Sequence, residues 1–497
     1  MKVLIKTTPI RVKYGINMSL RIRNILPILF ILFTAFLRFY RFEEFVTFLG
    51  DQGRDAIIVK RIITLEHLPA IGPPSSLGQI YLGPFYYYLI SPFLLFFNFN
   101  PVGLAFGVAL LSLAGIIISY LLVRKELDRV VALIYLIFLS FSAVNIQSSR
   151  FSWNPNLLPI FSFFTLYFFY KVLTSKNKLN AVAFGAFLSF SIQLHHLAFL
   201  LFLPLTVISI YLRLNKKGLN FLIAAFSFLL FSLPLIIFDL RHDFLNTKSL
   251  FQFFSQGNPT DHENFLFRFL DTNKSFYSHV FQTDLNQYLA LFLTVFLVFF
   301  IIKKGLSPKY LFISIHLLSL VFFILAFSFF NASRFAHYFG PIYFSFFLVF
   351  AWTITNITKK GLVSFFLIFM LILFYVSFNL KNLMYLFYTR GNNQIKKAEI
   401  IADSILQKDP QIPYQTVALP YVETDGHIRY FLEIKDKRPL PADTLNIPKE
   451  LYVFCFEKEC QVLGNPQWQI AAFKNAKIDK IWTVEGVKIY KLIHIND

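Results

Sequence analysis

Charged side chains are scarce in this chain of 497 residues: Asp, Glu, Lys and Arg make up 15% of it, against about 25% in soluble proteins. Hydrophobic residues account for 56%, and the mean hydropathy is +0.59. This composition excludes an ordinary soluble enzyme and an intrinsically disordered chain. It is typical of a polytopic membrane protein, since long apolar segments need lipid around them.

Several nucleotide and metal motifs are missing. The sequence contains no GxxxxGK[ST], GxGxxG, HExxH or CxxC pattern, so ATP-driven transport, dinucleotide redox chemistry and zinc proteolysis lack their signals. Two cysteines, Cys455 and Cys460, are too few for a disulfide framework. In an oxidising compartment they can form one disulfide, and two buried thiols are the alternative.

Acidic residues are few where the chain is most apolar. Residues 1–378 carry 31 Lys and Arg against 13 Asp and Glu, whereas residues 379–497 carry 16 against 14. The positive-inside rule explains such an excess, because Lys and Arg collect in short cytoplasmic loops. No basic stripe with interleaved aromatic residues is present, so the sequence does not indicate nucleic-acid binding.

Long apolar runs are what the chain has instead, with 66 Phe and 24 Tyr. A membrane-spanning helix needs about 20 mostly apolar residues. One run, 81–99, is broken by Gly83, Pro84 and Pro92 and contains Tyr86 and Tyr87, which is typical of an interfacial helix. The other runs predict 11 spans, at 24–40, 101–123, 130–147, 156–173, 181–195, 196–212, 220–238, 287–302, 310–330, 338–357 and 361–379.

The loops predict the topology. With 81–99 in the interface, every short basic break falls on the cytoplasmic side, namely 124–125, 171–178, 213–217, 303–309 and 359–360, together with the basic N-terminal head. Eleven of the 13 acidic residues then fall in two long outside loops, 41–100 and 239–286. We expect a multi-pass protein of the cell membrane with a cytoplasmic N-terminus and residues 1–379 as the membrane module.

The tail, residues 380–497, reads as a small α/β domain on the extracytoplasmic side. It has a helical pattern at 394–407 and short strand-like runs at 415–419, 428–433, 451–456 and 486–493, separated by Pro and Gly. The predicted fold class is therefore an α-helical polytopic membrane protein of about 11 spans with an extracytoplasmic α/β C-terminal domain.

The first outside loop carries the most promising polar motif. Asp51 and Asp55 lie four residues apart with Arg54 between them, so both carboxylates share one helix face. A carboxylate at the membrane surface can act as a general base on an acceptor hydroxyl, or bind a metal. The alternative is structural, with Asp51 as a helix cap and Arg54 and Asp55 as a solvated pair.

Two further turns on the same side combine arginine with aromatic residues. In one, Arg150 precedes Trp153 and Asn154; in the other, Arg334 precedes His337 and Tyr338. A guanidinium here can bind a lipid-linked phosphate. The alternative is an interfacial aromatic belt with a snorkelling arginine.

Two other polar groups complete the candidate substrate pocket. His195 and His196 follow one short span, and adjacent histidines point to different helix faces, so a shared metal is not expected. Hydrogen-bonded interfacial histidines are the alternative. Arg241 opens the second outside loop, where it can grip an acceptor or form local salt bridges.

The order of these features over residues 20–380 resembles the GT-C superfamily of membrane glycosyltransferases, which includes protein O-mannosyltransferases and lipid A aminoarabinose transferases. Asp51 matches the family's catalytic aspartate, Gln52 and Asp55 replace its usual Glu and Tyr, and Ser149-Arg150-Phe151 resembles its Ser-Arg-Tyr turn.

The resemblance implies a polyprenyl-phosphate sugar as donor and inverting transfer. Asp51 and Asp55 are then catalytic, and Arg150, Arg334, Tyr86 and Tyr87 contact the donor phosphate and lipid. No cofactor is expected, and the acceptor is a lipid, a glycan or a protein.

Two other functions remain as alternatives. A transporter or lipid flippase needs ionisable residues at mid-membrane and internal repeats, but only His316 lies near a span centre and no repeat is evident. A transferase of whole oligosaccharides would favour a larger acceptor domain than this tail.

Overall fold

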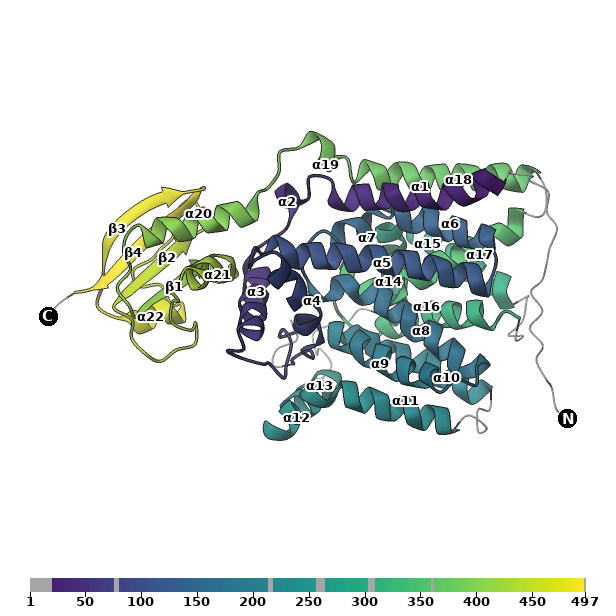
Figure 1. The fold of residues 1–497 in the computed structure, drawn as a ribbon, viewed down its shortest axis with the longest axis horizontal. Coiled ribbons are helices and arrows are strands. Elements are labelled where there is room, and N and C mark those ends of the chain that lie inside the picture. Colours follow the sequence, from purple (N-terminus) through teal and green to yellow (C-terminus); the bar gives the residue numbers. More distant parts are fainter. Residues whose placement is uncertain are drawn as a thin grey trace.

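The computed structural model describes residues 20–75, 80–212, 218–255, 264–302, 309–358 and 362–495. Within these ranges the chain forms a helical bundle with a small α/β lobe at one end (Figure 1). The predicted basic head and the basic turns at 213–217, 303–304 and 359–360 lie outside the described residues.

Every predicted span overlaps a helix of the bundle. The bundle and its connecting segments contain α1 (Leu20–Phe39), α2 (Phe42–Phe45), α3 (Gly50–Ile63), α4 (Phe85–Phe96), α5 (Val102–Glu126), α6 (Arg129–Phe141), α7 (Ala143–Ser148), η1 (Asn154–Leu157), α8 (Leu158–Thr174), α9 (Leu179–Leu194), η2 (His196–Leu201), α10 (Phe202–Tyr211), α11 (Gly218–Phe231), α12 (Leu233–Arg241), α13 (Leu245–Ser255), α14 (Phe265–Phe281), α15 (Gln287–Ile302), α16 (Leu311–Phe327), η4 (Ala336–Ile342), α17 (Tyr343–Thr358), α18 (Leu362–Lys381) and α19 (Tyr385–Tyr388).

Some of these helices are long enough to cross a membrane and others are not. Among the described residues, four helices are long and apolar enough to cross a membrane, and α11 with α12 makes a fifth candidate that bends by 61°. The other apolar helices have 10–17 residues. The membrane character is thus clear, while the number of 11 spans stays a prediction. Helix α4 has 12 residues, about 18 Å at 1.5 Å per residue, which is too short to cross a bilayer core of about 30 Å.

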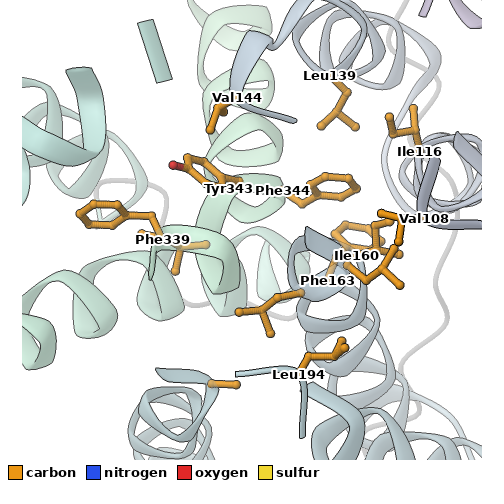
Figure 2. Close-up of a cluster of buried hydrophobic side chains, with 14 of the residues drawn as sticks. Val108, Ile116, Leu139, Val144, Ile160, Phe163, Leu194, Phe339, Tyr343 and Phe344 are labelled. Atoms are coloured by element: carbon orange, nitrogen blue, oxygen red, sulfur yellow. The ribbon is translucent and has the colours of Figure 1, made fainter. Parts of the chain in front are cut away.

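Large apolar side chains fill the centre of the bundle. Figure 2 shows one such cluster, in which Ile116 of α5, Leu139 of α6, Phe163 of α8 and Phe344 of α17 meet. Small residues let these helices approach: a Cβ at Gly115 would lie 2.5 Å from Ile160. Because α5, α6, α8 and α17 share this core, the loops at their ends are held in fixed positions.

Helix α14 is an element that the sequence pattern missed. It lies inside the predicted second outside loop and buries one face, including Asn273 and Tyr277, against the bundle. The Tyr277 hydroxyl lies 3.0 Å from Thr294 Oγ1 of α15, and Thr294 Oγ1 donates to Asn273 Oδ1 at 2.7 Å. These bonds replace the water that an exposed loop would have.

The lobe, residues 394–494, contains α20 (Gln394–Leu406), β1 (Tyr414–Leu419), α21 (Gly426–Ile434), β2 (Glu450–Cys455), α22 (Trp468–Phe473), β3 (Ala476–Val484) and β4 (Val487–His494). Its sheet has the order β1-β2-β4-β3, with β1 parallel to β2 and the other pairs antiparallel. Cys455 and Cys460 form a disulfide, which decides the alternative that the sequence left open.

Two features of the lobe correct the sequence interpretation. The run 428–433 is helical, because Ile428, Phe431 and Leu432 have the i, i+3, i+4 spacing of one buried helix face. Strand β3 was not predicted, since Lys and Asp interrupt its apolar residues; it forms the exposed edge of the sheet.

The lobe is docked directly onto α3. A Cβ at Gly53 would lie 2.1 Å from the backbone nitrogen of His427, and one at Gly426 would lie 2.4 Å from the carbonyl oxygen of Gly50. Helices α3 and α21 therefore touch backbone to backbone, and only glycine fits at the contact.

Ion pairs extend this interface toward the end of α3. Buried Glu433 of α21 accepts from Arg61 at 3.0 and 2.7 Å and from Arg438 at 2.9 Å. Glu66 pairs with Lys60 and Arg438. Hydrogen bonds from Lys60, Arg438 and Thr64 lower the pKa of the Glu66 carboxyl to about 2.

We expect Gly53→Ala to weaken the docking of the lobe by about 1–3 kcal/mol, because the added methyl group must displace backbone atoms of α21. The thermal unfolding midpoint should fall, and limited proteolysis between residues 388 and 394 should become faster. Gly218→Ala is the matched control, because nothing lies within 4 Å of a Cβ there. Equal midpoints for Gly53→Ala and wild type would contradict the backbone contact.

We expect Glu66→Gln to lower the unfolding midpoint at pH 7, with the difference from wild type shrinking as the pH falls below about 4. A carboxyl whose folded pKa is depressed stabilises the fold above its unfolded pKa of about 4.3, and this contribution is lost as the pH falls through about 2. Unfolding of both proteins from pH 7 to pH 2.5 measures this. Glu43→Gln, at an exposed position of α2, is the control, and a difference that is constant with pH would argue against the network.

Candidate active site

Helix α3 presents a compact acid–arginine cluster. Arg54 donates from Nη1 to Asp51 Oδ1 at 2.9 Å and from Nη2 and Nε to Asp55 Oδ1 at 2.8 and 3.0 Å. The Asp51 side chain is 56% exposed, whereas that of Asp55 is fully buried. One guanidinium thus links an accessible carboxylate to a buried one.

At the start of α3, Gln52 and not Asp51 supplies the capping side chain. Gln52 Oε1 accepts the backbone N–H of Leu49 at 3.1 Å, so Gln52 caps α3. Within the described residues, Asp51 makes no capping bond and pairs with Arg54, and the Arg54–Asp55 pair is buried at Asp55 rather than solvated. Lys60 and Arg61 in the last turn complement the helix dipole.

Helix α4 anchors the buried end of the cluster. The Tyr87 hydroxyl donates to Asp55 Oδ1 at 3.0 Å, and the Tyr86 hydroxyl lies 2.7 Å from Ser152 Oγ in the turn between α7 and η1. Burial raises the pKa of the Asp55 carboxyl, and the bonds from Arg54 and Tyr87 act in the opposite direction. The two predicted lipid-contacting tyrosines are themselves buried; Tyr87 holds α3, and Tyr86 holds the turn that carries Ser152.

Arg150 has partners that the sequence did not suggest. Its guanidinium is buried and donates to the carbonyl oxygens of Leu37, Arg38 and Tyr40 at 2.8, 2.7 and 2.9 Å. These are the carbonyls at the C-terminal end of α1, which have no partner within the helix. In this structure Arg150 fixes the end of α1, and its predicted contact with a phosphate stays a prediction.

Arg334 is held in a similar way. Its side chain is 6% exposed, donates to Thr272 Oγ1 at 2.8 Å and to the Phe330 carbonyl at 2.9 Å, and covers the ring of Phe327. It lies 3.9 Å from Asp271. Both predicted phosphate-binding arginines are engaged with protein groups, as Arg54 is with Asp51 and Asp55, and their contact with a phosphate stays a prediction.

A second cluster contains most of the predicted aromatic pocket. The ring centroid of His337 lies 4.6 Å from Trp153, 5.9 Å from His195 and 4.3 Å from Tyr338. Trp153 and His337 line a cavity of about 190 Å³ between α7, η1 and η4. Asn154 donates to the Leu194 carbonyl at 2.6 Å and so joins the end of α9 to this turn.

Two predicted residues stand outside these clusters. Arg241 is exposed at the end of α12, and no ion pair or ring contact among the described residues connects it to the other candidates. Both ring nitrogens of His196 are buried and lack a hydrogen-bond partner in the described part of the chain. Within those same ranges, no three His, Cys, Asp or Glu side chains come close enough to hold a metal.

Sequence reasoning did not single out the amides that position the site. Gln193 accepts from the backbone N–H of Phe85 at 3.3 Å and donates to the Phe231 carbonyl at 2.9 Å, which joins α4 to α9 and α11. Asn246 pairs with the backbone of Tyr81 through two bonds of 2.8 and 3.0 Å. The sequence signal that could have indicated them is a polar amide within or beside an apolar run.

The chain is similar to known membrane glycosyltransferases. Residues 82–238 match the family model of dolichyl-phosphate-mannose-protein mannosyltransferases. Among solved structures, ArnT from Cupriavidus metallidurans in the apo state aligns with a TM-score of 0.59 and 14% identity, over 94% of this chain and 97% of that one. The structure of that ArnT bound to undecaprenyl phosphate aligns with a TM-score of 0.51 and 12% identity, over the same shares of the two chains.

An oligosaccharyltransferase from Archaeoglobus fulgidus aligns with a TM-score of 0.49 and 15% identity, over 83% of this chain and 62% of that one. No curated protein sequence matches the chain. The predicted resemblance to the GT-C superfamily is confirmed, and at these identities the ArnT structures show the shared fold. The matched range of the family model begins after α3, so it does not include Asp51.

We expect Arg150→Lys to destabilise the protein by about 2–4 kcal/mol, because an ammonium group cannot bond to three carbonyls in different directions as the guanidinium does. Thermal unfolding of the purified protein measures this, with Arg241→Lys at an exposed position as the control. A variant that is fully stable but no longer binds polyprenyl phosphate would contradict the structural role and support the predicted phosphate contact.

Proposed function

We propose that this chain is an integral-membrane glycosyltransferase that moves a sugar from a polyprenyl-phosphate donor to an acceptor on the extracytoplasmic face. In this proposal the N-terminus is cytoplasmic, and the lobe and α3 lie outside. Nucleotide sugars are absent there, whereas a lipid-linked donor reaches the site sideways from the bilayer.

One observation carries the proposal: an accessible carboxylate, Asp51, is held by Arg54, which a fully buried Asp55 fixes in place. A general base must be reachable and correctly oriented. A cation next to it stabilises negative charge that develops on a leaving group. The fold supports the lipid-linked donor, since one ArnT structure of the same fold is bound to undecaprenyl phosphate.

The reaction is then a direct displacement with inversion. The acceptor hydroxyl gives its proton to Asp51, its oxygen forms a bond to the anomeric carbon, and the bond from that carbon to the phosphate oxygen breaks. The departing polyprenyl phosphate gains the negative charge, which Arg54 is placed to stabilise. Asp55 and Tyr87 position Arg54, and no step uses a cofactor.

We expect Asp51→Asn to lower sugar transfer by about 10²–10⁴-fold, the usual worth of a general base, while the protein stays folded and keeps its donor. The assay follows transfer from labelled polyprenyl-phosphate hexoses in membranes, together with binding of the donor. Asp284→Asn, at an exposed carboxylate in the second outside loop, should transfer normally. Full activity of Asp51→Asn would reject Asp51 as the base.

A further inference from the structure

The lobe carries a cavity of about 440 Å³ beyond the carboxyl ends of its two parallel strands, β1 and β2. Three segments line it: the residues after β1, the residues after β2 and the residues that lead into α22. Crevices at the carboxyl ends of parallel strands are frequent ligand sites, because loops from neighbouring strands diverge there.

The lining combines flat rings with carboxylates and amides. Tyr421 is 81% exposed and Trp468 is 54% exposed, although such side chains usually bury most of their area. The polar lining residues are Glu457, Glu459, Gln461, Asn465 and Gln467, and the lining contains no Lys or Arg. Aromatic faces pack on the apolar faces of sugar rings, while carboxylates and amides bond to hydroxyl and amino groups. An anionic ligand would be repelled here.

The disulfide gives this cavity a fixed wall. Cys460 is one of the lining residues, and its bond to Cys455 at the end of β2 ties down the segment that carries Glu457 and Glu459. On another side, Gln467 donates to the Ala418 carbonyl at 3.1 Å. A rigid site loses less entropy when a ligand binds.

Two short connections place the cavity beside α3. Tyr421 is three residues before Thr424, whose hydroxyl would be 1.3 Å from a Cβ at Gly50, the residue before Asp51. Glu457 follows Phe456, whose ring lies 6.0 Å from that of His427. The backbone of His427 in turn contacts Gly53.

We infer that this cavity binds the carbohydrate part of the acceptor, a neutral or amino sugar, and holds it next to Asp51. The inference rests on the proposed function and adds the chemical class of the acceptor. A second cavity of about 450 Å³ shares Trp468 with the first and extends toward Leu445 and Ile447. A glycan of more than one ring would extend across Trp468 into this second cavity, whose lining includes Lys474.

Direct binding to the full-length protein in lipid nanodiscs tests the site without turnover. The probes are trimers of N-acetylglucosamine, glucosamine and galacturonic acid, and a Ser-rich peptide of similar length. Wild type should bind the first two trimers at least tenfold more tightly than the galacturonic acid trimer. Trp468→Ala and Tyr421→Ala should weaken binding at least tenfold, and Glu459→Gln should reduce the preference for glucosamine.

Tyr388→Ala is the matched control, because Tyr388 is 79% exposed and lies outside the cavity. Sugar binding that is unchanged in Trp468→Ala and Tyr421→Ala, or binding of the peptide alone, would overturn the inference. So would a wild type that binds none of the trimers.

Turnover separates this inference from the proposed function. In the transfer assay, Trp468→Ala should raise KM for a glycan acceptor at least tenfold and leave donor binding unchanged. If wild type transfers sugar and Trp468→Ala has an unaltered KM, the cavity is not the acceptor site, whereas the proposed glycosyltransferase function stands. If wild type binds glycan through Trp468 but transfers sugar from no donor, the cavity is a glycan site and the proposed reaction is wrong.

Discussion

The contact between Gly53 of α3 and the first turn of α21 is the constraint on which the rest of the site depends. At this point two backbones meet with no room for a side chain, so a small shift of the lobe moves α3 with it. On its other side α3 is held by Tyr87 through the buried Asp55. Because α21 contacts one side of α3 and Tyr87 contacts the other, the first turn of α3, which carries Asp51, stays in one position.

Buried charge explains why this position is specific as well as stable. An ionised carboxylate removed from water needs bonds in definite directions. Asp55 obtains them from Arg54 and Tyr87, and Arg150 obtains its partners from the end of α1. Any displacement of α3 or α1 would leave one of these charges without its partner. The buried charges thus fix the register between elements that apolar contacts alone would allow to slide.

The sequence predicted the features that follow from hydrophobicity and missed those that depend on a particular partner. The apolar runs predicted where the helices of the bundle lie. Pro92, within a broken run, indicated that α4 is a short helix and not a span. Helix α21 was mistaken for a strand, because aromatic and β-branched residues are common in strands, although its helical spacing was visible afterwards. Arg150 shows the limit most clearly, because neither its residue type nor its loop position indicated that its guanidinium bonds to the carbonyls at the end of α1.

The docking of α21 on α3 also sets an order in time. Arg61 and Glu433 are 372 residues apart in the chain, so at about 5–20 residues per second the partner of α3 is made roughly 20–75 s later. Until then the carboxylate on α3 has no lobe beside it. A ribosome that stalls within the bundle leaves a membrane-inserted product without the finished site, and only a completed polypeptide meets its substrates with every contact in place.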